Sequence, residues 1–229
     1  MINKILLQKS KDKMENYIVN MIKSNLTDEW TYVNYINGEE IKYFNDNPLE
    51  EFPDIVDKFN SIIGQPHKAD LFRYYYLYIN GGVYLDSDAM IHDNIENIIK
   101  DFDFVSVLSF HKGTIFNGFI ATSPKHPIIY NALKHLYNIN PNTLNLVYFT
   151  PGKFLYDLLN QTKYENILLY NEYMNNGIGY TYDKNRMCII KHYPVTKIIP
   201  IINKGETLIP TKVGWTFETL KKFAYFKKK

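Results

Sequence analysis

The sequence predicts an α/β fold in which helices flank a mostly parallel central sheet. Apolar segments of strand length alternate along the chain with segments whose apolar residues recur at helical spacing, and this alternation is typical of α/β domains. No internal repeat, low-complexity linker or shift in composition interrupts the 229 residues. We therefore expect a single domain over residues 1–229.

The first predicted elements each have their own signal. Residues 2–7 are short and β-branched at their ends, which indicates a strand. Residues 11–21 carry an apolar stripe at helical spacing, and residues 30–36 alternate as a second strand. Pro48 and Pro53 open further helical stretches, because proline is favoured at the first position of a helix.

The rest of the chain continues the alternation around a central helix and strand, residues 67–80 and 83–85. After them, buried strands are expected at residues 102–108 and 115–121. Proline again opens a helix, at Pro127 and at Pro151. The pattern then predicts short strands at residues 167–169, 187–190 and 198–202.

Charge, cysteine content and hydropathy exclude several functional classes. The net charge of +2 gives no global field that would attract nucleic acid. The single cysteine, Cys188, excludes an internal disulfide and a thiolate metal cluster, so a reducing compartment is expected. No apolar run approaches the ~20 residues that span a bilayer. We therefore expect a cytoplasmic protein without a transmembrane segment.

The most informative segment is HKADLFRYYYLYINGGVYLDSD, residues 67–88. In the expected helix, Asp70 and Arg73 lie three residues apart and share a face. Gly81 stands where the end of a helix favours positive φ, and an apolar triplet then leads directly to Asp86 and Asp88. Four apolar residues at helical spacing should form the buried stripe of this helix: Ala69, Phe72, Tyr76 and Ile79.

Simple geometry brings these charges to one level. Arg73 lies about 12 Å along the helix from Gly81, at 1.5 Å per residue, and Asp86 lies about 13 Å along the returning strand, at about 3.3 Å per residue. Three carboxylates and a guanidinium should therefore meet at the edge where open α/β sheets bind ligands. A hard cation such as Mn²⁺ or Mg²⁺ would neutralise the carboxylates. Its open coordination positions would suit phosphate oxygens, so it could also neutralise the diphosphate leaving group of a sugar nucleotide.

A bare Asp-x-Asp motif is weak evidence by itself. The competing interpretation is a turn beside a surface ion pair worth about 0.2–0.5 kcal/mol. A second copy, Asp101-Phe102-Asp103, lacks the preceding helix, glycine pair and strand, and we expect it to be a loop that enters a strand. The six histidines show no spacing typical of a metal site.

The segment KADLFRYYYLYINGGVYLDSDA resembles the DXD-containing sugar-binding region of glycosyltransferase family 32. This family includes yeast initiating α-1,6-mannosyltransferase and α-1,4-galactosyltransferases, and clostridial glucosylating toxins carry a related segment. The resemblance implies a GT-A fold and retaining transfer of a hexose from a UDP- or GDP-sugar to a glycan, lipid or protein acceptor. Weaker likenesses extend over nearly the whole chain: INKILLQ, IFNGFIATSPKHPII, YFTPG and KHYPV.

The resemblance also implies roles for the residues of the central segment. Asp88 would bind the metal, and Asp86 would assist it while holding hydroxyls of the ribose and the sugar. Asp70 and Arg73 would grip the donor sugar, and Arg73 suits this role because its rigid fork can hold paired oxygens. Tyr84 would line the ribose side.

Residues outside the central segment complete the implied site. Asn117 would approach the sugar and join Asp86, Asp88 and Arg73 in catalysis. Relatives usually end the first strand with an aromatic residue that can stack on the base, where this chain has Gln8-Lys9-Ser10; we place Gln8 in the nucleotide site. Relatives also often carry a histidine before a Gly-Ser-Trp near the C-terminus, where this chain has Thr211-Lys212 and Trp215. We expect the last metal ligand in this segment and assign Trp215 to the nucleotide.

Two other functions fit parts of the pattern. This chain departs from its relatives at Gln8-Lys9-Ser10 and at Thr211-Lys212. If these two differences remove catalysis, the chain would be a catalytically degenerate protein that binds a sugar nucleotide without turnover. The stretch VYLDSDAM also looks like the nucleophile strand of haloacid-dehalogenase-type phosphatases, but that chemistry places the motif near the start of its domain. The membrane anchors of Golgi relatives are not seen in this sequence, which favours a source in a bacterium, a protist or a virus-infected host. The process that the resemblance favours is polysaccharide biosynthesis.

Overall fold

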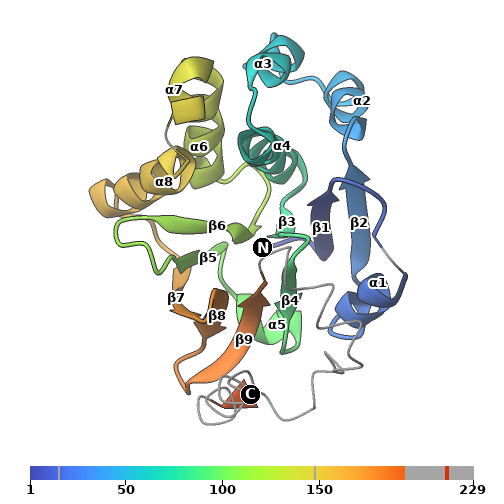
Figure 1. Ribbon diagram of the computed structural model, residues 1–229, viewed down its shortest axis with the longest axis vertical. Coiled ribbons are helices and arrows are strands. Elements are labelled where there is room, and N and C mark those ends of the chain that lie inside the picture. The colour runs from blue at the N-terminus through green and yellow to red at the C-terminus, as the bar shows by residue number, and fades with distance from the viewer. Residues whose placement is uncertain (15, 147, 194–214, 217–229) are drawn as a thin grey trace.

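A single curved sheet organises the described part of the chain, residues 1–14, 16–146, 148–193 and 215–216, in a computed structural model (Figure 1). Its strands are β1 (Ile5–Ser10), β2 (Thr31–Ile36), β3 (Gly82–Leu85), β4 (Ala89–Ile91), β5 (Phe104–Leu108), β6 (Ile115–Thr122), β7 (Ile167–Asn175), β8 (Ile178–Tyr182), β9 (Met187–His192) and β10 (Trp215–Thr216). The helices are α1 (Asn16–Lys23), α2 (Glu39–Asp46), α3 (Ile55–Ser61), α4 (Gln65–Asn80), α5 (Ile95–Ile99), α6 (Pro127–Asn138), α7 (Pro141–Leu146) and α8 (Thr150–Gln161).

The sheet has a parallel-rich centre and an antiparallel end. Its strand order is β10-β9-β8-β7-β5-β6-β3-β1-β2, and β4 pairs with β9. In the run from β2 to β7, every strand except β6 points the same way. The strands beyond β7 alternate in direction. The predicted mostly parallel sheet is thus confirmed for the centre, while the C-terminal part is an antiparallel extension.

Helices cover both faces of the sheet, and successive strand residues point to opposite faces. On one face, Leu7 and Tyr84 pack with side chains from α2, α3, α4, α6 and α8. On the other face, Leu6 and Val83 pack with side chains from α1 and α5. Two apolar cores therefore hold the sheet, and α4 lies at the centre of the larger one (Figure 1).

The central helix α4 is buried on nearly all sides. Every residue from 70 to 78 is buried, whereas Ala69 and Ile79 are only partly buried. The predicted single stripe is therefore right for Phe72 and Tyr76 and wrong as a description of the helix. The reason is that α4 packs at once against β3, α6 and the aromatic side chains around α2.

The glycine pair after α4 turns the chain into β3. Gly81 and Gly82 have φ values of 62° and 97°, and the amide of Gly81 donates to the carbonyl of Leu77 at 2.8 Å. A Cβ on Gly81 would lie 2.6 Å from the nitrogen of Pro124. The predicted positive φ at Gly81 is confirmed, and the turn leaves no room for a side chain.

Most other predicted elements are present with shifted ends. The first strand starts at Ile5, and the short strand predicted at residues 167–169 extends to Asn175. The elements α2, α5, α7, β4, β8 and β10 were not predicted, and the helix expected to open at Pro48 is not formed. The strand expected at residues 198–202 lies outside the described residues. None of the helices in the described segments combines the length and apolarity that crossing a membrane requires.

Candidate active site

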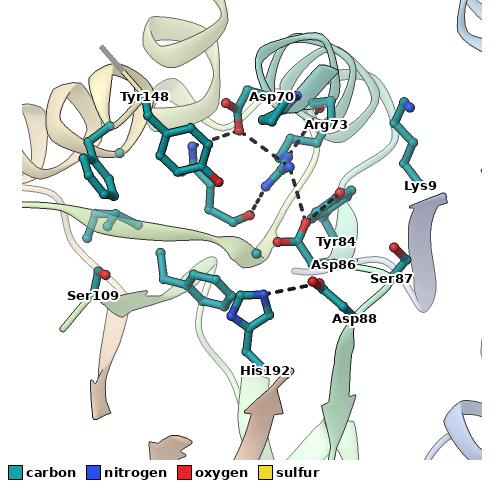
Figure 2. A pocket seen from close by; sticks show the side chains of 18 of the residues that line it. Lys9, Asp70, Arg73, Tyr84, Asp86, Ser87, Asp88, Ser109, Tyr148 and His192 are labelled. Atoms are coloured by element: carbon teal, nitrogen blue, oxygen red, sulfur yellow. Dashed lines mark hydrogen bonds and ion pairs between the residues drawn. The ribbon is translucent and has the colours of Figure 1, made fainter. Parts of the chain in front are cut away.

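A cavity of about 750 Å³ opens where the carboxyl ends of several strands meet. Asp86, Ser87 and Asp88 follow β3 directly, and Asp70 and Arg73 reach the cavity from α4 (Figure 2). The ends of β1, β7 and β9 and the loop after β5 complete its walls. This position agrees with the predicted ligand edge of an open α/β sheet.

The guanidinium of Arg73 bridges the two nearest carboxylates. Its Nη2 atom lies 3.6 Å from Oδ1 of Asp70 and 3.4 Å from Oδ1 of Asp86. Its Nη1 atom donates to the backbone carbonyl of Asn117, and its Cζ atom lies 4.1 Å from the centre of the Tyr84 ring. Burial disfavours the charged guanidinium, but Tyr84, Asp86 and Asp70 outweigh burial and raise the pKa of Arg73. The predicted meeting of Arg73 with Asp70 and Asp86 is confirmed.

The carboxylate of Asp86 is held between the helix and β6. The hydroxyl of Tyr84 donates to its Oδ1 at 2.9 Å, and its backbone amide donates to the carbonyl of Gly118 at 2.8 Å. A Cβ on Gly118 would lie 2.5 Å from Oδ2 of Asp86 and 2.1 Å from the ring of Phe116. Burial raises the pKa of Asp86, and the charge of Arg73 opposes this shift.

Asp88 pairs with a histidine that the sequence analysis did not select. Nε2 of His192, at the end of β9, lies 3.3 Å from Oδ1 of Asp88, and Figure 2 shows the two side chains facing each other. Each of Asp86, Asp88 and His192 offers a ligand atom, and these atoms lie within 4.8 Å of one another. Burial lowers the pKa of His192, but its hydrogen bond to Asp88 and the nearby negative charges raise the pKa on balance.

The group of two carboxylates and one imidazole suits a divalent cation. Carboxylate oxygens are ligands for Mg²⁺ and Mn²⁺, and imidazole nitrogen is accepted by the transition metals. Asp86 and Asp88 alone would place two negative charges close together. His192 adds a third metal ligand, and it adds no charge when it is neutral. The residues present therefore fit the expected metal.

Asn117 and Asp70 lock each other beside Arg73. Nδ2 of Asn117 donates to Oδ1 of Asp70 at 3.1 Å, and the hydroxyl of Tyr74 donates to Oδ1 of Asn117 at 3.0 Å. Nδ1 of His67 lies 3.3 Å from the other oxygen of Asp70. These contacts orient Asp70 and Asn117 at the cavity wall, where both were expected.

Gln8, which was expected at the nucleotide, packs inside the protein. Gln8 is fully buried: its Nε2 donates to the carbonyl of Asp86 at 3.1 Å, and its Oε1 accepts from Tyr32 at 2.8 Å. Gln8 does not line the cavity, because both ends of its amide are used inside the protein, and its role at the nucleotide stays a prediction. Lys9 lines the cavity instead. The backbone of Trp215 pairs with Cys188, while Thr211 and Lys212 lie outside the described residues.

The second Asp-x-Asp copy lies at the other edge of the sheet. Asp103 precedes β5 and accepts hydrogen bonds from the N-terminal amine at 3.0 Å and from Asn166 at 2.8 Å. Asp101 is exposed in a turn before it. The prediction of a loop that enters a strand is confirmed. The two carboxylates do not line the cavity.

The DXD segment has a match among known protein families. Residues 6–105 match the family described as "Glycosyltransferase sugar-binding region containing DXD motif". This part of the chain is therefore similar to that family. The matched residues include Asp70, Arg73, Asp86 and Asp88, so the resemblance predicted from this segment is confirmed.

Two similar proteins are glycosyltransferases by name. Inositol phosphoceramide mannosyltransferase 1 of Schizosaccharomyces pombe is 27% identical over 111 residues, which are 48% of this chain and 33% of the relative. Uncharacterized glycosyltransferase L373 of Acanthamoeba polyphaga mimivirus is 29% identical over 128 residues, 55% of this chain and 50% of the relative. The chain therefore matches a third to a half of the length of these relatives.

The fold also has a counterpart among solved structures. The PaToxG Glycosyltransferase superposes with a TM-score of 0.50 at 16% sequence identity, and the match covers 70% of this chain and 69% of that one. At this level of identity the similarity establishes the fold alone. It confirms the expected GT-A fold for the chain.

Proposed function

We propose that this DXD protein is a metal-dependent retaining glycosyltransferase, which moves a hexose from a UDP- or GDP-sugar to a glycan, lipid or protein acceptor. One observation carries the proposal: the Asp86–Asp88–His192 group and the Arg73 bridge line the same cavity of about 750 Å³. A site that suits a divalent cation thus lies beside the guanidinium of Arg73, which can hold sugar oxygens. The cytoplasmic location stays a prediction.

The metal group and the nucleotide fit at one side of the cavity. Asp86, Asp88 and His192 would hold Mn²⁺ or Mg²⁺, which supplies charge neutralisation at the diphosphate of the donor. Lys9 and Ser87 lie on this side (Figure 2). Lys9 is paired with Glu40 at 2.9 Å, so its ammonium group is held in place at the cavity wall.

The donor sugar fits beside Arg73. Asp70 and Asn117 are oriented by their mutual hydrogen bond at 3.1 Å, and Arg73 lies between Asp70 and Asp86. Carboxylates accept hydrogen bonds from sugar hydroxyls, while the guanidinium donates. Because these groups are already paired, and Asp70 and Arg73 are buried, the site is preorganised and a bound sugar needs little rearrangement of the protein.

Retention of configuration is the stereochemistry that we propose. Inversion needs a general base on the side opposite the leaving group. Asp70, Asp86 and Asp88 are committed to Arg73, His192 and the metal group, and Glu172 in the cavity wall already accepts hydrogen bonds from Ser109 and Phe110. Asn117 is an amide and a poor nucleophile for a covalent intermediate. We therefore favour substitution on one face, in which the departing diphosphate takes the acceptor proton while Arg73 stabilises the developing charge.

A donor screen tests the function. The purified protein is mixed with UDP- and GDP-hexoses, with and without Mn²⁺, and thermal unfolding and donor hydrolysis are measured. We expect one donor to raise the melting temperature only with the metal, since ligands that bind the folded state stabilise it. Slow release of free hexose from the same donor would show a working active centre. Binding without hydrolysis or transfer would favour the degenerate sugar-nucleotide-binding protein, and phosphatase activity without donor binding would favour the dehalogenase-type alternative.

The anomeric configuration of the product tests the mechanism. An α-configured donor should give an α-linked product, which NMR coupling constants identify. A β-linked product would contradict retention. In that case Glu172, a further carboxylate in the cavity wall, would be the first residue to consider as the general base.

A further inference from the structure

The part of the cavity beyond the proposed donor is lined by aromatic rings. We name Phe110, His111, Tyr148 and Phe149 the aromatic wall. The ring centres of Phe110 and His111 lie 3.9 Å apart, those of His111 and Phe149 lie 4.5 Å apart, and those of Tyr148 and Phe149 lie 5.2 Å apart. Tyr148 is 65% exposed and Phe149 is 43% exposed. The rings thus form a continuous surface that solvent reaches.

The aromatic wall comes from two loops, one between β5 and β6 and one before α8. Figure 2 shows Tyr148 and Ser109 at one side of the cavity and Lys9 and Ser87 at the other. Asp70, Arg73 and Asp86 lie between these sides (Figure 2). A ligand on the aromatic wall would therefore face the sugar end of the donor and not its base.

A buried carboxylate stands at the foot of the aromatic wall. Glu172 on β7 is 6% exposed, and its Oε2 accepts from the hydroxyl of Ser109 at 3.2 Å and from the amide of Phe110 at 3.3 Å. A Cβ on Gly179 would lie 2.4 Å from its Oε1, so the glycine provides the space for this oxygen. Burial raises the pKa of Glu172. Both hydrogen bonds found within the described residues go to Oε2, which leaves Oε1 as an acceptor.

We propose that the aromatic wall and Glu172 form the acceptor subsite and that its ligand is a six-membered ring bearing hydroxyls, either a hexopyranose or an inositol. This inference rests on the proposed function. Aromatic faces offer large, rigid apolar contact to the C–H face of such a ring. A carboxylate accepts hydrogen bonds from its hydroxyls. A purely apolar ligand would offer no hydrogen-bond donor to Oε1 of this buried carboxylate, which is unfavourable.

Binding of the ring can be tested without turnover. Saturation-transfer NMR of the protein with methyl α-mannopyranoside, methyl β-galactopyranoside or myo-inositol should show transfer to the ring protons of at least one. Phe149→Ala should reduce this transfer, and its partly exposed side chain can be removed without opening the core. Tyr173→Ala is the matched control, since Tyr173 is 57% exposed on the same strand as Glu172 and lies outside the cavity wall. No transfer from any ring polyol, or equal loss in Tyr173→Ala, would overturn the proposal.

Kinetics distinguish positioning from catalysis. With the donor found in the screen, Phe149→Ala and Glu172→Gln should each raise the acceptor KM about tenfold, which corresponds to ~1.4 kcal/mol, with little change in the donor KM. A fall in kcat with unchanged acceptor KM in Glu172→Gln would overturn the positioning role. Transfer only to peptides, with none to sugars or inositol, would overturn the ligand class. Failure of the proposed function looks different, because then the wild-type protein binds no donor in the presence of Mn²⁺.

Discussion

Asp88→Asn should weaken metal-dependent donor binding by at least about 100-fold, as the loss of a metal-binding group implies. The substitution removes the charge that faces His192 at 3.3 Å and leaves Asp86 as the single carboxylate of the group. An amide oxygen is a weaker ligand for a hard cation than a carboxylate. Isothermal titration calorimetry with the nucleotide in the presence and absence of Mn²⁺ measures the effect directly.

The second Asp-x-Asp copy provides the matched control for this experiment. Asp101→Asn makes the same chemical change in an exposed turn at the opposite edge of the sheet. Its donor affinity should equal that of the wild-type protein. Unchanged nucleotide affinity in Asp88→Asn, or equal loss in Asp101→Asn, would contradict the assignment of the metal group.

Arg73→Lys should lower the transfer rate by about 100-fold or more while the fold persists. The planar fork reaches Asp70, Asp86 and the carbonyl of Asn117 together, and a single ammonium group cannot replace that geometry. Arg73 is not part of the predicted apolar stripe of this helix, yet the structure buries it at 5% exposure. Lysine nevertheless keeps a positive charge, so the buried carboxylates are not left unpaired.

The Arg73→Lys experiment needs a measurement of folding and a control substitution at another arginine. Circular dichroism and thermal unfolding should show a folded Arg73→Lys protein whose melting temperature is lower by a few degrees. Arg186, the other arginine of the chain, is exposed in the turn between β8 and β9, so Arg186→Lys should behave as wild type. A near wild-type transfer rate in Arg73→Lys would show that the bridge is only structural.

The parts of the site that the sequence predicted are those that depend on local structure. Asp70, Arg73 and Asp86 lie on one helix and the strand that follows it, and the Gly81 turn fixes their relation. Rise per residue along two consecutive elements was therefore enough to bring them together. Gln8 was placed only by resemblance to relatives, and rise per residue says nothing of its orientation, which depends on neighbours such as Tyr32.

The parts that the sequence did not predict depend on long-range strand pairing. His192 reaches Asp88 because β9 pairs with β4, and Glu172 reaches the cavity because β7 pairs with β5. Neither residue has a distinctive neighbour in the sequence. The helix α2 was also not predicted, because it buries only two apolar residues, Tyr43 and Phe44, beside the polar Glu40. Only the pairing of the strands could reveal these positions.

The pairing of β4 with β9 also sets when this centre can first exist during synthesis. His192 follows Asp88 by 104 residues (192 − 88), and the amide of Tyr193 donates to the carbonyl of Asp88 at 2.8 Å to join the two segments. At roughly 5–20 residues per second, a ribosome needs about 5–20 s to bridge that gap. Throughout this interval the nascent chain holds the DXD carboxylates without their imidazole partner. The Asp86–Asp88–His192 group therefore forms only once β9 has been translated and has joined the sheet.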